Sequence, residues 1–230
     1  MTGTRAVLFD LNGTLAYVKE GITDNELSEC LFSRGYEVSP QQLRAAWNFV
    51  SLIDYPKYGY RDWHSYLSRV FWRLKVGVDE ETLEEIAKLL KSRPYQLCQD
   101  ARSAVLLAKN SGVKTAVVTT IAYFKFKDAL RPIRKHLDLV MTGYEAGCDK
   151  SNPRMYRKVL EALGVKPQEA VMIGDELELD ILLPKRLGIN AILLDREGKN
   201  KGQPVDASVY DLNEAMETII NKQGKTEQTS

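Results

Sequence analysis

The sequence contains few of the residues that build disulfide frameworks and zinc sites. It has three cysteines, Cys30, Cys98 and Cys148, and two histidines, His64 and His136. The cysteines lie far apart and form no CxxC pair. A disulfide framework or a zinc site is therefore not expected, and cysteine usage is that of a chain in a reducing compartment.

Net charge, long apolar runs and glycine-rich loops are also missing. The 32 basic and 31 acidic residues leave a net charge of +1, which provides no strong field for nucleic acid or an anionic membrane. No stretch approaches the roughly 20 apolar residues of a transmembrane helix, and the chain opens without the apolar region of a signal peptide. Neither a GxxxxGKS/T loop nor a GxGxxG motif is present. We expect a cytoplasmic protein with no nucleic-acid or membrane partner, whose oligomeric state the sequence leaves open.

Short apolar runs alternate with segments of helical periodicity along most of the chain. The apolar runs are 6–9, 115–118, 137–141, 170–173 and 191–194. The segments with helical spacing are 101–110, 124–135, 154–163 and 180–187. Uninterrupted apolar runs are typical of strands covered on both faces, and their alternation with helices predicts an α/β fold with a doubly wound parallel sheet.

Residues 18–95 differ from the rest, because apolar residues recur there at three- and four-residue intervals over four successive segments. They predict an inserted all-helical cap domain, with the α/β core formed by 1–17 and 96–230. Trp47, Tyr66 and Trp72 have the spacing of bundle core residues, whereas 55–63 is expected to be a loop and a specificity element. A last helix is expected over 212–220, followed by a disordered tail over 223–230.

Polar side chains stand directly after three of the apolar runs. They are Asp10, Thr119 and Asp175, with Asp180 five positions further on, and Lys150 precedes a predicted helix. In an open parallel sheet, ligands bind beyond the carboxyl ends of the strands. Clustered carboxylates repel one another unless a cation joins them, and Mg²⁺ prefers carboxylates, water and phosphate oxygens as ligands. The sequence therefore predicts a magnesium and phosphate site at this edge.

The same residues resemble four ordered motifs of the haloacid dehalogenase superfamily. The motifs are FDLNGTL at 9–15, Thr119, Lys150 and GDELELD at 174–180. The resemblance covers about residues 4–16 and 96–198, on either side of the insertion. It points to the phosphatase-like branch of this superfamily, with a helical cap over a Rossmann-like core.

The resemblance implies a Mg²⁺-dependent hydrolase of small phosphorylated metabolites. Asp10 is implied as the nucleophile that forms an aspartyl-phosphate. Mg²⁺ is implied to bind Asp10, the backbone carbonyl of Asn12 and Asp175, with Asp180 supporting the metal. By the same resemblance, two further residues hold the phosphate oxygens, namely Thr119 and Lys150.

Asn12 departs from the pattern, because phosphatases of this superfamily usually carry an aspartate there that protonates the leaving group. A carboxamide cannot relay a proton, and general acid-base catalysis is worth about 10²–10⁴-fold. Two alternatives therefore stay open: a metal-free, dehalogenase-like hydrolase, and a catalytically impaired phosphate-binding or regulatory protein. Pro184 is a second irregularity, since it predicts that the helix after Asp180 starts late or bends.

Overall fold

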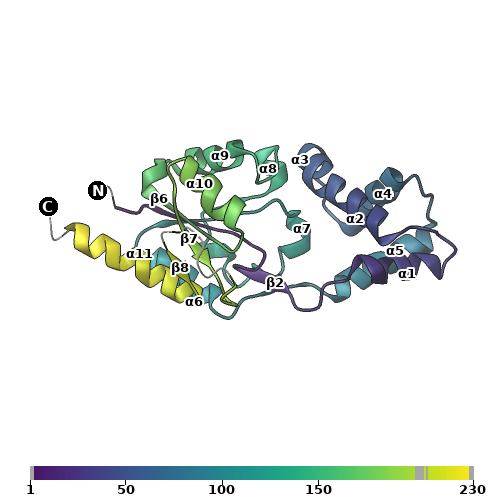
Figure 1. Cartoon of the computed structure of the whole chain (residues 1–230), viewed down its shortest axis with the longest axis horizontal. Helices are drawn as coiled ribbons and strands as arrows, with labels where there is room; N and C mark the ends of the chain where they lie inside the picture. The colour runs from purple at the N-terminus through teal and green to yellow at the C-terminus, as the bar shows by residue number, and fades with distance from the viewer. Residues whose placement is uncertain (1–2, 200–204, 206, 228–230) are drawn as a thin grey trace.

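The computed structural model describes residues 3–199, 205 and 207–227, which form an α/β core joined to a helical cap (Figure 1). Within these residues the main sheet is parallel and has six strands in the order β5-β4-β1-β6-β7-β8. The strands are β1 (Ala6–Phe9), β4 (Lys114–Val118), β5 (Leu139–Met141), β6 (Ala170–Gly174), β7 (Asn190–Leu194) and β8 (Ser208–Val209). The predicted doubly wound α/β fold with a helical insertion is confirmed, and each of the five apolar runs overlaps a strand. The sixth strand, β8, has only two residues, too few to show a period.

Strand β1 is buried on both faces, and its alternate side chains enter two separate cores. Val7 and Phe9 pack into one cluster, and Ala6 and Leu8 pack into the other. Because successive strand residues point to opposite faces, a strand between two helical layers must be apolar throughout. The run that predicted this strand therefore reflects its central place in the sheet.

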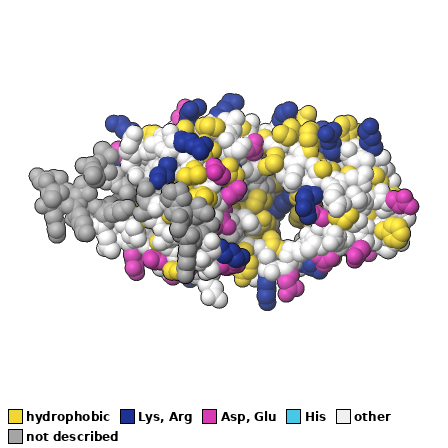
Figure 2. Space-filling view, in the orientation of Figure 1, with side chains coloured by type: hydrophobic (Ala, Val, Ile, Leu, Met, Phe, Trp, Pro, Cys, Tyr) yellow, Lys and Arg dark blue, Asp and Glu magenta, His cyan; other side chains and the backbone are white. Residues whose placement is uncertain are grey.

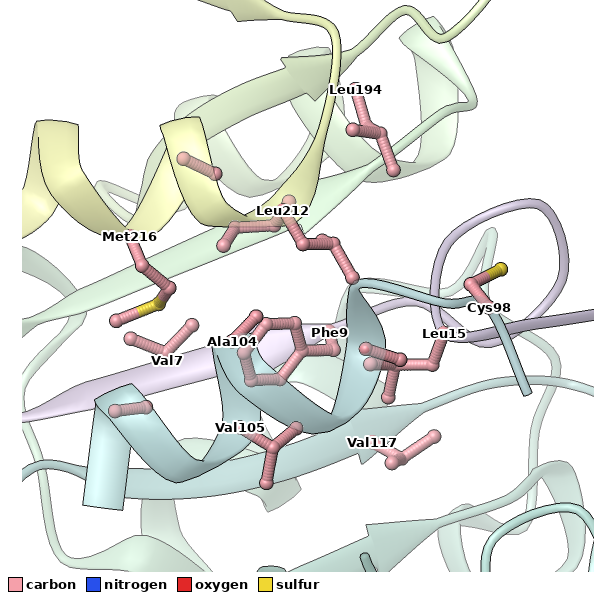
Figure 3. Close-up of a cluster of buried hydrophobic side chains, with 14 of the residues drawn as sticks. Val7, Phe9, Leu15, Cys98, Ala104, Val105, Val117, Leu194, Leu212 and Met216 are labelled. Atoms are coloured by element: carbon pink, nitrogen blue, oxygen red, sulfur yellow. The ribbon is translucent and has the colours of Figure 1, made fainter. Parts of the chain in front are cut away.

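Helices cover both faces of the sheet. On one face, α6 (Ala101–Asn110) and α11 (Leu212–Glu227) pack against β1, and Figure 3 shows Ala104, Val105, Leu212 and Met216 around Phe9. On the other face lies α9 (Pro153–Leu163). Helix α11 extends to Glu227, so the tail expected over 223–230 is helical as far as that residue, and 228–230 lie outside the described residues.

Two predicted helices differ from the structure. The segment 124–135 forms one helical turn, α7 (Tyr123–Phe126), then turns and a 3-10 turn, η2 (Arg134–His136). Pro132 prevents a continuous helix as far as residue 135, because proline has no N–H to donate and disfavours helix at the residue before it. Phe126, Leu130 and Ile133 are nevertheless buried, and their spacing produced the helical pattern.

The helix around Asp180 starts early rather than late. It begins as a π-type turn, η4 (Leu177–Leu182), and continues as α10 (Leu183–Arg186). The N–H of Leu183 bonds the carbonyl of Glu178, five residues back. Pro184 then stands in the first turn of α10, where N–H groups have no intrahelical α-type acceptor, so its missing donor costs little.

The cap lies between β1 and β4, with its helices over residues 24–92. Its elements are α1 (Asp24–Phe32), α2 (Pro40–Phe49), η1 (Val50–Asp54), α3 (Tyr55–Tyr58), α4 (Trp63–Leu74) and α5 (Glu80–Ser92). The chain leaves and re-enters the core through two antiparallel strands, β2 (Ala16–Val18) and β3 (Tyr95–Leu97). No helix among the residues described is both long enough and apolar enough to cross a bilayer.

Two expectations for the cap are wrong. The segment 55–63 is not wholly a loop, because α3 occupies Tyr55–Tyr58 and ends at Gly59, which has a φ of 64°. Trp72 is 62% exposed rather than buried in the cap core, and the Arg69 guanidinium lies 3.9 Å from its ring centroid. Trp72 shares the helical spacing of the buried residues but faces out. Tyr66 is fully buried, as expected.

Candidate active site

Three carboxylates meet at the carboxyl edge of the sheet. Asp10 follows β1, Asp175 follows β6, and Asp180 lies in η4. The two strands are parallel neighbours with Phe9 opposite Ile173, so the residues that follow them emerge side by side. One oxygen from each carboxylate lies within 4.8 Å of the others. The π-type turn brings Asp180 back to the edge, where its Oδ2 accepts a hydrogen bond from the Glu176 N–H at 3.1 Å.

Lys150 joins two of these carboxylates although it is 140 residues from Asp10 in the chain. Its buried ammonium donates to Asp10 Oδ1 and lies 2.5 Å from Asp180 Oδ1. Burial alone would lower the pKa of Lys150, but the negative charges of Asp10 and Asp180 raise it above its ordinary value. The lysine therefore stays charged, and the three carboxyl groups of the cluster outnumber the single ammonium.

The pKa values of Asp175 and Asp180 are both raised in this cluster. Burial, helped by the charge of Asp10, raises the pKa of Asp175 to about 6, although this residue is exposed at the mouth of the site. Burial also raises the pKa of Asp180. Asp180 Oδ1 is fully buried, and its partner is the Lys150 ammonium. These carboxylates are poised to accept a further cation.

Two glycines let the backbone approach these carboxylates. A Cβ on Gly174 would lie 2.3 Å from Cγ of Asp180, and a Cβ on Gly13 would lie 2.2 Å from Oδ2 of Asp175. Gly13 also has a φ of 79°, a left-handed conformation that other residues rarely adopt. The glycines of the two motifs are therefore required by close packing around the acids.

Thr119 and Asn12 stand at the same edge with different surroundings. Thr119 is buried, follows β4 beside β1, and its Oγ1 accepts a hydrogen bond from the Ile121 N–H at 3.2 Å. Asn12 is exposed, and its side chain has no hydrogen-bond partner within the described part of the chain. The turn that carries it is closed by bonds from the Gly13 N–H to Ala16 and from the Ala16 N–H to Leu11.

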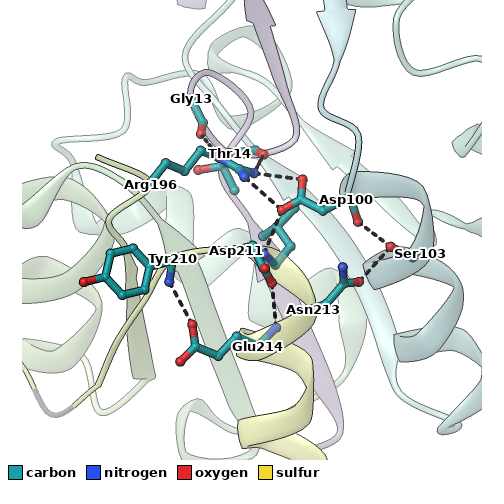
Figure 4. A network of polar contacts seen from close by, with 10 residues as sticks. Gly13, Thr14, Asp100, Ser103, Arg196, Tyr210, Asp211, Asn213 and Glu214 are labelled. Atoms are coloured by element: carbon teal, nitrogen blue, oxygen red, sulfur yellow. Dashed lines mark hydrogen bonds and ion pairs between the residues drawn. The ribbon is translucent and has the colours of Figure 1, made fainter. Parts of the chain in front are cut away.

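A polar network that the sequence did not predict holds this turn in place (Figure 4). Arg196, after β7, donates to the carbonyl oxygens of Gly13 at 3.2 Å and Thr14 at 2.9 Å. The same guanidinium donates to both oxygens of Asp100, at 2.8 and 3.0 Å. Asp100 in turn accepts from the Leu212 N–H at 2.9 Å. No motif marked Arg196 or Asp100, because each acts through partners nearly 100 or more residues away.

We expect Arg196→Met to lower the free energy of unfolding by about 2 kcal/mol, since it removes charge-assisted hydrogen bonds and leaves a partly buried carboxylate. Burial would raise the pKa of Asp100, but bonds from Arg196 and the Leu212 N–H lower it below its usual range. This stabilisation is present at neutral pH and is lost as the pH falls through the lowered pKa. In urea unfolding, the free energy of unfolding of Arg196→Met should therefore be below that of wild type at pH 7. The gap between the two proteins should narrow in acid.

Arg186→Met provides the matched control for that measurement. Arg186 is exposed and reaches Glu178 only at 4.0 Å, so its loss should change stability by less than about 0.5 kcal/mol. Equal stability of Arg196→Met and Arg186→Met would contradict the conclusion that the hydrogen bonds of Arg196 stabilise the turn at Gly13.

Two cavities lie at the surface near this edge of the core. The first, of about 720 Å³, lies between the cap and the core and is lined on the core side by residues that follow Thr119, Thr120 to Ala122. The second, of about 820 Å³, is lined by Gly13, Asp175 and Arg196. Figure 2 shows the surface hollowed between core and cap, with acidic side chains on the core side. The second cavity therefore gives access to Asp175, and the first lies beneath the cap beside the segment that follows Thr119.

An acidic cluster at the carboxyl edge of a doubly wound sheet, beneath a helical cap, defines a capped α/β hydrolase. The haloacid dehalogenase-like hydrolase family model matches residues 4–188. The chain therefore belongs to the haloacid dehalogenase-like hydrolases, as the motifs predicted.

Relatives of known name extend this result. The chain is 26% identical over 224 residues to haloacid dehalogenase-like hydrolase domain-containing protein 3 of Mus musculus, covering 90% of this chain and 86% of that protein. It is 29% identical over 126 residues to phosphoserine phosphatase of Thermus thermophilus, covering 53% of this chain. That match spans only 51% of the phosphatase, about half its length.

Solved structures agree on the fold. A HAD phosphatase from Thermococcus onnurineus is 23% identical with a TM-score of 0.63, covering 94% of this chain and 98% of that one. A 2-haloacid dehalogenase from Pseudomonas syringae is 18% identical with a TM-score of 0.67, covering 95% and 99% of the two chains. The same architecture thus serves both a phosphatase and a dehalogenase, so the fold alone does not choose between them.

Proposed function

We propose that this chain is a Mg²⁺-dependent phosphatase of small phosphorylated molecules. The observation that carries the proposal is the cluster of Asp10, Asp175 and Asp180 with Lys150 at its centre. Similarity to named phosphatases supports it, since the chain is also 32% identical over 97 residues to glyceraldehyde 3-phosphate phosphatase of Pyrococcus furiosus, covering 40% of this chain and 39% of that protein.

The chemistry of the site fits a divalent cation. Its donors are carboxylate oxygens, the hard ligands that Mg²⁺ prefers. The three carboxyl groups outnumber the one ammonium of the cluster, and Asp175 is the carboxylate that Lys150 does not pair. Asp10, Asp175 and the carbonyl oxygen of Asn12 would hold the ion, while Asp180 would support it. The bound ion would neutralise the charge of the phosphate and the carboxylates as they approach each other.

Asp10 is the proposed nucleophile. Its carboxylate oxygen attacks phosphorus in line, the bond from phosphorus to the leaving oxygen breaks, and an aspartyl-phosphate forms. Water then cleaves the phosphate and restores the carboxylate. Lys150 and the Thr119 hydroxyl hold the phosphate oxygens, and the charge of Lys150 lowers the repulsion between Asp10 and the incoming anion.

A phosphate-release screen with and without Mg²⁺ tests this function. We expect release from at least one class of phosphate monoester, loss of at least about 100-fold in EDTA because the charge that the ion offsets is restored, and recovery on adding Mg²⁺. Activity that is indifferent to EDTA, together with halide release from a 2-haloacid, would instead identify a metal-free dehalogenase-like enzyme.

A further inference from the structure

The cavity beneath the cap contains a lysine enclosed by aromatic rings. Lys125 of α7 places its Nζ 3.6 Å from the ring centroid of Tyr66, 4.7 Å from Trp47 and 4.9 Å from Trp63. The neighbouring Phe124 ring lies at 6.0 Å. All five residues line the cavity. The core supplies the lysine and Phe124, and the cap supplies the other three rings.

Lys125 has no carboxylate partner among the described residues, in contrast to the active-site lysine. Aromatic faces attract an ammonium through their quadrupole, so the rings favour its charged form. Burial nevertheless lowers its pKa to about 7. A cation that is desolvated in this way, without a counter-ion, gains from an anion that enters the cavity.

The rest of the cavity has the same excess of positive charge. Three further cations line it, exposed and without an ion-pair partner in the described part of the chain, namely Arg61, Lys91 and Lys127. Each lining carboxylate is engaged elsewhere: Asp24 pairs with Arg44, Asp62 accepts from the Ser65 N–H at the start of α4, and Asp128 pairs with Arg131. The cavity is therefore suited to an anionic ligand with an apolar body.

The wall of the cavity includes neighbours of the proposed catalytic residues. Its wall includes Thr120, whose Oγ1 accepts a hydrogen bond from the Lys150 N–H at 3.0 Å. It also includes Tyr95, whose pKa burial and the charge of Asp10 raise to about 12. We therefore place the leaving group of a phosphate bound at Asp10 on the side of the aromatic rings.

We propose that the Lys125 ammonium, held by Trp47, Trp63 and Tyr66, binds a carboxylate on the leaving group of the substrate. The substrate is then a phosphate monoester that carries a carboxylate beside a flat or apolar body. This inference builds on the proposed phosphatase activity for the position of the phosphate. The lysine is a specificity residue, since it touches the leaving group and not the reacting atoms.

Matched ligands separate binding by Lys125 from catalysis. Titration calorimetry compares 4-hydroxybenzoate with phenol on wild type, Lys125→Met, Lys125→Arg and Lys135→Met, without any need for turnover. Wild type should prefer 4-hydroxybenzoate by tenfold or more, as expected for one charge-assisted hydrogen bond. Lys125→Met should lose this preference, and Lys125→Arg should keep part of it. Lys135 is exposed and does not line the cavity, so Lys135→Met should behave as wild type.

The kinetic arm uses 4-carboxyphenyl phosphate and phenyl phosphate. Lys125→Met should raise KM for the carboxylated substrate about tenfold or more and leave KM for phenyl phosphate within about twofold, with kcat little changed. An unchanged preference in folded Lys125→Met, or no preference in wild type, overturns the inference. If no phosphate ester is hydrolysed but the binding preference depends on Lys125, the carboxylate site stands and the phosphatase proposal fails.

Discussion

Asp10→Asn should abolish turnover while leaving the fold intact. The amide has the size of the carboxylate but lacks its nucleophilic oxygen, so we expect phosphate release to fall by on the order of 10⁴-fold or more. Lys150 would keep Asp180 as an ion-pair partner, which limits the structural cost. Phosphate release at saturating Mg²⁺ measures the loss, and the thermal unfolding midpoint shows whether the variant is folded.

Intact mass after acid quenching distinguishes a nucleophile from a merely supporting carboxylate. Wild-type protein quenched during turnover should be heavier than the untreated protein by one phosphoryl group. Asp10→Asn should show no such increase in mass. Glu178→Gln makes the same chemical change at an exposed position in η4 and should keep both activity and the adduct. Asp10→Asn with near wild-type turnover would rule out the aspartyl-phosphate route.

Asn12→Asp should increase turnover, and most strongly for poor leaving groups. The exposed Asn12 side chain has no hydrogen-bond partner among the described residues, so the substitution breaks no contact of the fold. A carboxyl group there can protonate the leaving oxygen and then activate water, which is worth about 10²–10⁴-fold. We expect kcat for an alkyl phosphate to rise about 100-fold and kcat for an aryl phosphate less than about tenfold, because a phenolate leaves without a proton.

Asn12→Ser is the control for this gain of function. It is polar but cannot relay a proton, so neither substrate should be accelerated. Equal acceleration of alkyl and aryl phosphates by Asn12→Asp would contradict the assignment of an acid role to this position. If the wild type released no phosphate from any substrate and only Asn12→Asp were active, the natural chain would be identified as an impaired phosphate-binding protein.

The central strand and two of the acids were predictable from local pattern. A strand covered by helices on both faces must be apolar throughout, and the uninterrupted apolar run 6–9 has this character. Parallel strands present their carboxyl ends at one edge, which is why Asp10 and Asp175 could be placed together. The helix predictions were less accurate where a proline intervened: Pro132 interrupts 124–135, and Pro184 is accommodated after a π-type turn.

The side chains that complete the site depend on contacts that local pattern does not contain. Lys150 was expected near the acids, but its place between Asp10 and Asp180 depends on α9 packing against the sheet. Arg196 belongs to no motif. It binds backbone carbonyl oxygens, and every residue type has one, so the pattern of side chains does not reveal this contact. Trp72 has the period of the cap core and faces solvent.

The sequence by itself determined the α/β class, the acidic edge and the family, because strand burial and residue order along the chain are local properties. Only the tertiary structure decided which cations meet which anions. Lys150 forms ion pairs with two carboxylates. Lys125 lies between aromatic rings and has no carboxylate partner in the described part of the chain. Both are lysines near the carboxyl edge of one sheet, and their different chemistry arises from burial and neighbours that are distant in the chain.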